Sequence, residues 1–498
     1  MEMTGSSYLE LLRLTTPEII VALAGFLLLV LDLTFLRQAA LAIRFRTAIA
    51  AACIGCVLAL LVLESGSAQG TLPAGMLVVN SLTQLLQVAL LVLAILVLLW
   101  VGGARFTTHV GEYCALILFA TTAMMLLVST QNLLVIFITI EFLSLSLYIL
   151  TGSDKDSPQS AEAALKYFLF GGMSAGILLF GMSLLYGISG SIALQPIAAA
   201  VNASPGDPIL TLAMVMLLVG FGFKIAAAPF HMWAPEVYQG APTASAALVA
   251  SGSKVASFFA LFLVFYLGLM GAAGSAAWGH YSPGWAPLIA ILAALSMLWG
   301  NLAAIAQTSV RRVLAYSAIG HAGYMLIALV THSPESLIAL VYYVFTYALA
   351  TVGAFGVLAA LEGEKVDNIA DFAGLGKRAP GLSFCLLIFL LSLAGIPPLA
   401  GFAGKFYVFV AALEIPDHFG LLWLVLLALV MSVVSFYYYL KILKQSYVSE
   451  PKPGAAAINV PVITRIALWA TAALVVILGC LPDLLLNRIS AAVAGALQ

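Results

Sequence analysis

The sequence predicts an all-α polytopic membrane protein with about 14 transmembrane helices, arranged as two inverted repeats that each contain one broken helix. Of its 498 residues, 63% are hydrophobic and only 8% are charged, whereas a typical soluble domain carries about 25% charged residues. The mean hydropathy is +1.12. Such a chain has too few charged side chains to cover a water-soluble particle of 52.3 kDa. We therefore expect it to lie in lipid.

Fourteen apolar runs are long enough to cross a bilayer. A hydrocarbon core about 30 Å thick needs about 20 helical residues, and segments rich in Gly, Pro, Ser and Asp separate the runs. The predicted spans are residues 15–36, 45–65, 79–102, 113–130, 133–152, 162–187, 208–228, 242–271, 285–306, 313–331, 335–361, 381–412, 419–445 and 461–484. The intervening segments are too short for a separate soluble domain, which needs about 50 residues.

Charge and cysteine content exclude several other classes of protein. The net charge of −1 provides no basic field for nucleic acid. The one C-x-x-C pair, Cys53 and Cys56, lies in an apolar run without a second pair nearby, so we expect no disulfide framework, zinc site or iron–sulfur site. The N-terminal segment lacks the basic region and cleavage site of a secretory signal, so the first apolar run is expected to remain as a helix.

The basic residues predict the orientation, because Lys and Arg accumulate in cytoplasmic loops. Fourteen of the 20 follow odd-numbered spans or flank them: Arg37, Arg44, Arg46, Arg105, Lys155, Arg311, Arg312, Lys365, Lys377, Arg378, Lys441, Lys444, Lys452 and Arg465. Only Arg13 and Arg488 lie near the opposite side. Both termini should therefore face away from the cytoplasm, on the periplasmic side of a bacterial inner membrane.

Four lysines and one deep acid inside the apolar spans are functional candidates by default, because charges are costly there. Glu141 and Lys254 lie near the middle of their spans, too deep to reach the interface easily. Lys166 lies four residues after Glu162, near the start of its span, so an i,i+4 ion pair would explain it without a function. Lys224 and Lys405 complete the set.

Lys224 and Lys405 each lie in a helix that is predicted to be broken. Pro229 follows Lys224, and Pro397 and Pro398 precede Lys405 in a run too long for one straight span. Membrane proteins tolerate such breaks where they border protein or a wet cavity. The pentapeptides GFGFK and GFAGK, which end at these lysines, suggest an internal repeat whose copies run in opposite directions.

This repeat predicts the internal division of a single membrane domain that extends over 1–498. We expect the first three helices in 1–110, a first repeat of helices 4–8 in 111–271 and a second repeat of helices 9–13 in 285–445. The last helix lies in 446–498. His321, near the middle of the tenth span, lies between the two lysine-bearing halves and is a candidate proton relay.

Six segments together resemble the antiporter-like membrane subunits of bacterial respiratory complex I, the proton-translocating NADH–quinone oxidoreductase, and within them the subunit N type. They cover nearly the whole chain, and the most specific is APFHMWAPEVYQGAP. The segments lie at residues 17–33, 111–150, 162–176, 223–243, 307–324 and 391–409. In this family an acid in the fifth span and charged groups in the seventh, eighth and twelfth form a polar axis, which the resemblance assigns to Glu141, Lys224, Lys254 and Lys405.

The resemblance also implies where the redox chemistry takes place. A lysine in the twelfth span, where the sister subunit M has a glutamate, favours the subunit N type. The implied partners are M-like and K-like membrane neighbours, membrane lipid and a peripheral redox arm. NADH, flavin, iron–sulfur clusters and quinone are expected in those partner subunits, with no redox centre or cofactor in this chain.

The residues suggest a mechanism for proton transfer. A carboxylate about 4 Å from a buried ammonium stabilises its charged form by about 4 kcal/mol at an effective dielectric constant of about 20. Movement of Glu141 towards or away from Lys224 would therefore switch the lysine between holding and releasing its proton. The predicted route runs from the cytoplasm to Lys224, through Lys254 to Lys405, with His321 as a candidate relay.

Three other functions remain open from the sequence. A subunit of a multi-subunit sodium/proton antiporter would share the fold, although one deep carboxylate is a poor sodium cage. A subunit of a membrane-bound hydrogenase complex would have different partners. A passive scaffold would use all the deep charges for structure alone.

Overall fold

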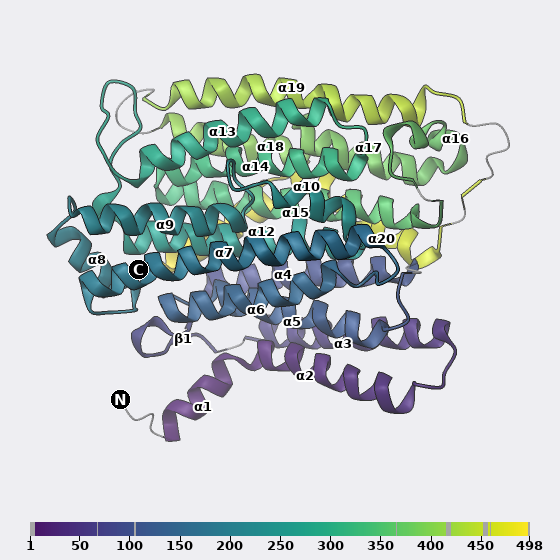
Figure 1. Cartoon of the computed structure of the whole chain (residues 1–498), viewed down its shortest axis with the longest axis horizontal. Helices are drawn as coiled ribbons and strands as arrows, with labels where there is room; N and C mark the ends of the chain where they lie inside the picture. Colours follow the sequence, from purple (N-terminus) through teal and green to yellow (C-terminus); the bar gives the residue numbers. More distant parts are fainter. Residues whose placement is uncertain are drawn as a thin grey trace.

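A computed structural model describes residues 5–66, 68–103, 106–364, 366–414, 420–451, 457–458 and 460–496. Most of these residues form helices that run side by side in one bundle, as Figure 1 shows. Arg105, Lys365 and Lys452, three of the basic residues used to predict the orientation, lie outside the described residues.

In the described part of the chain, twelve helical segments are long and apolar enough to cross a membrane. They are formed by α2 (Thr16–Val30) with its π-helical end (Leu31–Phe35), α3 (Leu41–Glu64), α4 (Ser81–Trp100), α5 (Val110–Val128), α6 (Leu133–Thr151), α7 (Pro158–Ser189), α11 (Thr243–Ala250) with α12 (Gly252–Leu263), α13 (Trp285–Ile305), α14 (Val310–Thr331), α15 (Pro334–Ala360), α19 (Leu422–Tyr447) and α20 (Val462–Cys480). They correspond to all the predicted spans except the seventh and the twelfth.

The seventh and twelfth predicted spans are the two that the structure breaks. The seventh, predicted over 208–228, contains α9 (Pro208–Lys224), and α10 (Trp233–Gly240) continues beyond its predicted end after the break. The twelfth consists of α17 (Pro380–Ala394) and α18 (Ala400–Leu413). With these two, the prediction of about 14 spans with two broken helices is confirmed.

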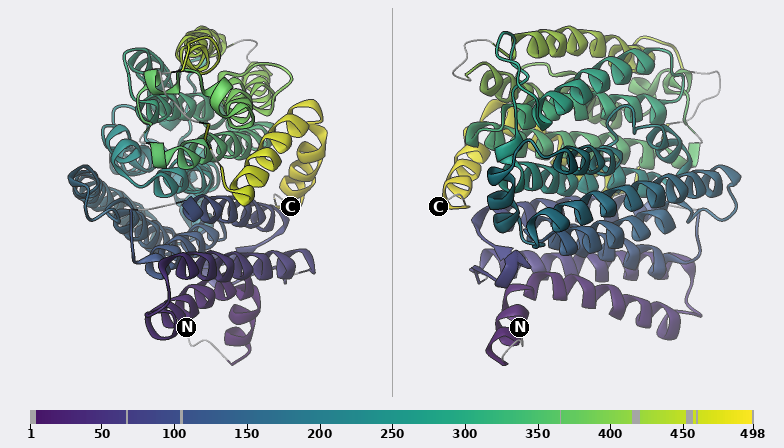
Figure 2. Two further views of the ribbon diagram at one scale, coloured as in Figure 1. Left: turned by 90° about the vertical axis from the view of Figure 1, so that its right-hand side faces the viewer. Right: turned by 60° about the vertical axis from the view of Figure 1, so that its left-hand side comes forward.

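Several shorter elements were not predicted. They are α1 (Gly5–Leu14), α8 (Leu194–Ala203), α16 (Leu375–Arg378), α21 (Asp483–Ala496) and a small hairpin of β1 (Gly70–Thr71) and β2 (Val78–Val79). All of them lie between or beside the spans, where short amphipathic helices and turns can lie at the interface between membrane and water. In Figure 2, the last two helices, α20 and α21, lie along one side of the bundle. The first spans lie at the edge opposite to α19.

Polar side chains at the helix starts explain where several spans begin. A hydroxyl, amide or carboxylate oxygen at the N-cap accepts a hydrogen bond from a free backbone N–H of the first turn. These N-caps are Asn80, Asn132, Ser157, Asp207, Ser309 and Ser333. Since lipid offers no hydrogen bonds to backbone groups, such caps fix the ends of the spans close to the membrane surface.

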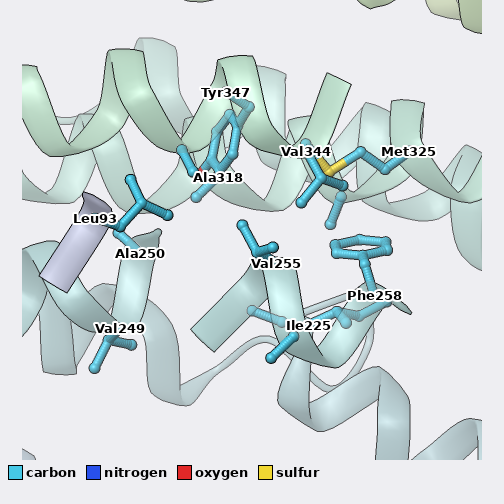
Figure 3. Close-up of a cluster of buried hydrophobic side chains, with 14 of the residues drawn as sticks. Leu93, Ile225, Val249, Ala250, Val255, Phe258, Ala318, Met325, Val344 and Tyr347 are labelled. Atoms are coloured by element: carbon cyan, nitrogen blue, oxygen red, sulfur yellow. The ribbon is translucent and has the colours of Figure 1, made fainter. Parts of the chain in front are cut away.

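The centre of the bundle is formed by α12, α14 and α15, which are buried almost all round. A helix that is apolar on every side belongs in such a position. In Figure 3, Val255 and Phe258 of α12 lie beside Met325 of α14 and Val344 of α15. The outer helices α3, α7 and α19 instead expose rows of large apolar side chains, as expected for surfaces that face lipid.

A buried ion pair connects the first, second and fourth spans at the end of the bundle that carries most of the basic residues. The carboxylate of Asp32, which is 1% exposed, accepts hydrogen bonds from Nε and Nη2 of Arg44 at 2.8 and 2.6 Å. It also accepts one from the backbone N–H of Gly111 at 3.2 Å. Removal of one partner of a buried pair leaves an uncompensated charge.

We predict that Arg44→Ala destabilises the protein by about 3–5 kcal/mol, because Asp32 then lies buried without its cation. The measurement is the midpoint of thermal unfolding in detergent, followed by circular dichroism. Arg46→Ala is the matched control, since Arg46 is an exposed arginine on the same helix. Equal midpoints for the two variants would contradict this account of Asp32.

Candidate functional site

The first broken helix ends at Lys224, and its free backbone groups find partners nearby. Ala226 has a φ of +57°, which turns the chain out of the helix. The indole N–H of Trp233 donates to the carbonyl of Phe223 at 2.9 Å. The N–H of Ala228 donates to the hydroxyl of Ser296 on α13 at 2.9 Å. Side chains thus replace the helical hydrogen bonds that the break removes, as a membrane interior requires.

The ammonium group of Lys224 points to α6, where it donates to the hydroxyl of Ser144. Lys224 is 7% exposed. Glu141 lies one turn before Ser144 on the same helix, and it interacts electrostatically with Lys224 without coming within the 4.0 Å that defines an ion pair. Its Oε1 atom is buried and has no hydrogen-bond partner. The carboxylate is therefore close to the lysine but not bound to it.

Lys254 lies on α12, directly after a third break that the sequence analysis did not predict. Ser251, between α11 and α12, leaves the helical conformation with φ −117° and ψ −85°, and its hydroxyl donates to the carbonyl of Ala247 at 2.6 Å. The ammonium of Lys254 donates to the carbonyl of Ala318 on α14 at 2.6 Å. It also lies 5.7 Å from the centre of the Tyr347 ring.

The break in the twelfth span provides the oxygens that hold Lys405. Gly395 has a φ of +89°, which ends α17 and leaves its last carbonyls without helical partners. The ammonium of Lys405 donates to two of these carbonyls, Leu393 at 3.2 Å and Ala394 at 3.0 Å. A third hydrogen bond, at 2.9 Å, goes to the hydroxyl of Ser432 on α19. The negative end of the α17 dipole thus faces a cation.

His321 lies on α14, three residues after the carbonyl that Lys254 contacts, which is about one helical turn. Its Nδ1 atom is 2.7 Å from the hydroxyl of Tyr343, and its Nε2 atom is 3.4 Å from the hydroxyl of Tyr439. Tyr439 also shares a hydrogen bond with Ser317. Both tyrosines are buried. The imidazole is therefore held at both nitrogens by groups that can donate and accept protons.

The three buried lysines share one electrostatic feature. Among the described residues, no carboxylate lies within ion-pair distance of Lys224, Lys254 or Lys405. Their hydrogen-bond acceptors are hydroxyl and backbone carbonyl oxygens. A buried ammonium is costly without a paired anion, and these neutral oxygens offset only part of that cost. Such lysines are suited to proton exchange, because no permanent ion pair holds the proton on the nitrogen.

Lys166 does not belong to this buried line. It is 37% exposed and forms the i,i+4 ion pair with Glu162 at 2.6 Å. A second carboxylate, that of Glu236 on α10, lies 3.0 Å away and also pairs with Arg312 at 3.0 Å. This network ties α7, α10 and α14 together at the end of the bundle that is rich in basic residues.

The two matching pentapeptides are not equivalent in the structure. GFGFK ends at Lys224, before its break, whereas GFAGK ends at Lys405, six residues into the half-helix that follows its break. The shared feature is instead the proline-containing break itself, which holds Pro229 in the segment 225–232 and Pro397 and Pro398 in the segment 395–399. A short sequence match cannot distinguish these positions, since it does not contain the break.

Several polar partners of the lysines and of His321 were missed from the sequence. Ser144 could have been found, because it lies on the same helix face as Glu141 at a spacing of three residues. Ser432, Tyr343 and Tyr439 come from distant helices and carry no such local signal. The buried carboxylate of Glu18, which accepts from Gln87 at 2.6 Å near the start of the first span, was also not singled out.

Comparison with known proteins identifies the family. Residues 130–435 match the family model described as NADH:quinone oxidoreductase/Mrp antiporter, TM. The NADH-quinone oxidoreductase subunit N 2 of Acidobacterium capsulatum is 56% identical over 97% of this chain and 99% of its own length. Subunit N of Desulforamulus reducens is 41% identical over 84% of this chain and 85% of its own length.

A solved structure agrees with these relatives. A chain of respiratory complex I from Thermus thermophilus, solved with bound aureothin, has a TM-score of 0.76 and 35% sequence identity. The match covers 96% of this chain and 100% of that one. The chain has buried lysines on broken helices, matches the family model, and is similar to these relatives along nearly their whole length. It therefore belongs to the NADH:quinone oxidoreductase/Mrp antiporter membrane family.

Proposed function

We propose that the chain is a proton-translocating membrane subunit of a respiratory NADH–quinone oxidoreductase, of the subunit N type. One observation carries this proposal. Each of three interrupted spans presents a buried lysine whose ammonium is held by neutral oxygens and not by a carboxylate. Three groups of this kind at the centre of a membrane bundle are expensive to bury and have no evident structural use, so transport of protons is the function that fits them best.

The proton route follows the order of the contacts. A proton enters at Lys224, passes through water to Lys254 and continues by way of His321 to Lys405. Lys254 contacts the carbonyl of Ala318 on α14, and His321 lies one turn further along the same helix. The carbonyl of Leu393, which accepts from Lys405, also faces His321. These shared groups support transfer between the second and the last lysine.

Glu141 acts as the switch at the start of the route. Its unpartnered oxygen and its separation from Lys224 leave it able to approach the ammonium or to withdraw. An approach to about 4 Å would favour the charged lysine by about 4 kcal/mol at an effective dielectric constant of about 20. Withdrawal would release the proton to the next acceptor.

The energy for this switch comes from partner subunits. Quinone reduction in a peripheral arm that carries NADH, flavin and iron–sulfur clusters would supply the energy, transmitted through M-like and K-like membrane neighbours. The chain is in this sense part of an enzyme without a redox centre of its own.

The membrane is the bacterial inner membrane, with both termini on the periplasmic side. The short helix α16, which carries Lys377 and Arg378, lies at the end of the bundle opposite α1, as Figure 1 shows, and its position supports this orientation. Lys166, in the charged network at that end, would lie on the cytoplasmic side of Lys224, where the route begins. The repeats comprise residues 111–271 and 285–445, with residues 1–110 before them and 446–498 after them.

A first experiment distinguishes whether the route needs only a positive charge at residue 224 or a proton that this side chain can release. We predict that Lys224→Ala and Lys224→Arg both slow redox-coupled proton transfer through this chain by roughly a hundredfold or more, since arginine keeps the charge but does not release its proton. Proton uptake is measured in vesicles that contain the assembled complex. Glu141→Ala should have the same direction of effect, with assembly checked on native gels. Full proton stoichiometry in Lys224→Ala would overturn the role of this lysine.

A second experiment tests the tyrosine that holds His321. Tyr343→Phe removes one hydrogen bond of about 1 kcal/mol, so we expect proton transfer to slow by about fivefold and its pH profile to change. Tyr342→Phe is the matched control, because its buried hydroxyl donates to the carbonyl of Leu478 at 2.7 Å, away from His321. If both variants lowered the rate equally at every pH, Tyr343 would have only a structural role.

A third experiment distinguishes the proposed function from a sodium/proton antiporter. The isolated chain in vesicles, without quinone turnover, is expected to exchange no sodium for protons, because its lysines offer no oxygen cage for a hard cation. The measurement is sodium-driven acidification of the vesicle interior. Exchange that disappears in Lys405→Ala would favour the antiporter.

A further inference from the structure

A polar cavity lies beside α8, at the end of the bundle that carries α1 (Figure 1). It has a volume of about 330 Å³ and extends between the starts of α4 and α15, the segment after α5, and the last turns of α12 with its π-helical end (Val264–Gly268). No described residue of its wall is charged, and its polar groups are hydroxyls and amides: Asn80, Thr83, Thr130, Gln131, Gln195 and Tyr266. Such groups bind water. We call this cavity the vestibule.

The vestibule reaches the surface of the molecule. Gln195 on α8 is exposed, and together with Gln131 it lines both the vestibule and a neighbouring cavity of about 420 Å³. The wall of that second cavity includes Thr71 and Pro196, which are also exposed. Polar groups thus lead from the surface into the vestibule. In the orientation proposed above, this surface faces the periplasm.

Apolar side chains close the inner end of the vestibule. Phe259 lines the vestibule and also a second space, of only about 10 Å³, between α4, α12 and α15. The other residues around this small space are apolar and buried: Leu86, Val255, Phe258, Leu340, Val341 and Val344. We call these residues, with Phe259, the apolar layer. A cavity of that size holds one water at most, and only where two or more polar groups bind it. The apolar layer is therefore dry.

The apolar layer separates the vestibule from Lys254. On α15, Leu337 lines the vestibule, Val344 belongs to the apolar layer, and Tyr347 follows along the same helix (Figure 3), with its ring 5.7 Å from the ammonium of Lys254. On α12 the order runs from Phe262 in the vestibule, across the apolar layer, back to Lys254. These two helices pack against each other and against α4, where the vestibule residues likewise precede the layer residue. The distance from Leu337 to Tyr347 is about 15 Å along the helix.

A water-filled access so close to a proton carrier would divert the proton. Protons move along water and hydrogen-bonding side chains, and an apolar constriction that excludes water stops this movement. If the water of the vestibule extended to Lys254, the ammonium could exchange its proton with the outside before the proton reached His321 and Lys405.

We propose that the apolar layer insulates Lys254 from the vestibule, with Phe259 as the positioning residue that keeps the two spaces apart. A proton on Lys254 then continues to His321 and Lys405 and does not leave at this point. The inference rests on the proposed function where it concerns the proton on Lys254. The wet vestibule and the dry layer can be tested without that function.

Cysteine labelling tests the two spaces in the assembled complex. A charged, water-soluble methanethiosulfonate is added on the side of the membrane that carries α1, and the labelled peptides are identified by mass, so that the native cysteines do not interfere. Thr83→Cys, in the vestibule, should react at least about tenfold faster than Leu340→Cys, in the apolar layer. When Phe259→Ser is added to Leu340→Cys, that cysteine should become reactive. No reaction at Thr83→Cys, equal rates at the two positions, or a Leu340→Cys that stays unreactive beside Phe259→Ser would overturn the proposal.

Passive proton conductance tests the insulation itself. In vesicles with the assembled complex and no quinone turnover, Phe259→Ser should speed the decay of an imposed pH gradient at least about tenfold, and Lys254→Ala in the same chain should remove most of this leak. Phe259→Leu keeps the layer apolar and should leak no more than about twofold above the unaltered complex. Phe265→Ser is the matched control, because Phe265 is buried against Trp285, with ring centres 5.4 Å apart, and lines neither space. Retention of a trapped dye verifies that the vesicles stay intact.

The outcomes separate this inference from the proposed function. No leak in Phe259→Ser, an equal leak in Phe265→Ser, or a leak that persists without Lys254 would overturn the insulating role and leave the proposed function as it is. Full proton pumping in Lys224→Ala would instead contradict the proposed function, and the labelling of the vestibule would not depend on it.

Discussion

Three ammonium groups lie in the interior of a bundle that has almost no anions to pair with them, and the rest of the structure accommodates this burial. An unbroken helix in lipid has no backbone oxygens to spare, because each carbonyl except the last four is hydrogen-bonded to its own helix. The breaks change this. At the end of α17 the free carbonyls of Leu393 and Ala394 turn towards Lys405, so the helix break and the lysine form one site.

The breaks must in turn be stabilised, and the protein uses different groups for each. Trp233 and Ser296 satisfy the backbone groups freed around Lys224, whereas the hydroxyl of Ser251 bonds within its own helix beside Lys254. None of these groups is charged. Glu141, whose Oε1 atom has no hydrogen-bond partner, is a carboxylate that interacts electrostatically with Lys224.

The periphery of the bundle has a different chemistry. Where acids and bases meet at the basic end, they form ion pairs, as in Asp32 with Arg44 and Glu236 with Arg312. The first pair connects two consecutive spans, and the second connects α10 with α14. The acids and bases at the rim are thus paired, whereas the central lysines have no carboxylate within ion-pair distance among the described residues.

The amino-acid sequence alone determined that this protein lies in lipid, how many spans it has, and the positions of one deep acid and four lysines within them. Composition and run length decide these properties directly, because lipid accepts only apolar helices of sufficient length. It also located the breaks near Pro229 and near Pro397 and Pro398, where proline removes a backbone donor. Only the tertiary structure decided which oxygens hold each lysine, that Ser251 breaks a third helix, and that Tyr343 and Tyr439 enclose His321. Those contacts join helices far apart in the chain, and their energies depend on distances that no local pattern of residues contains.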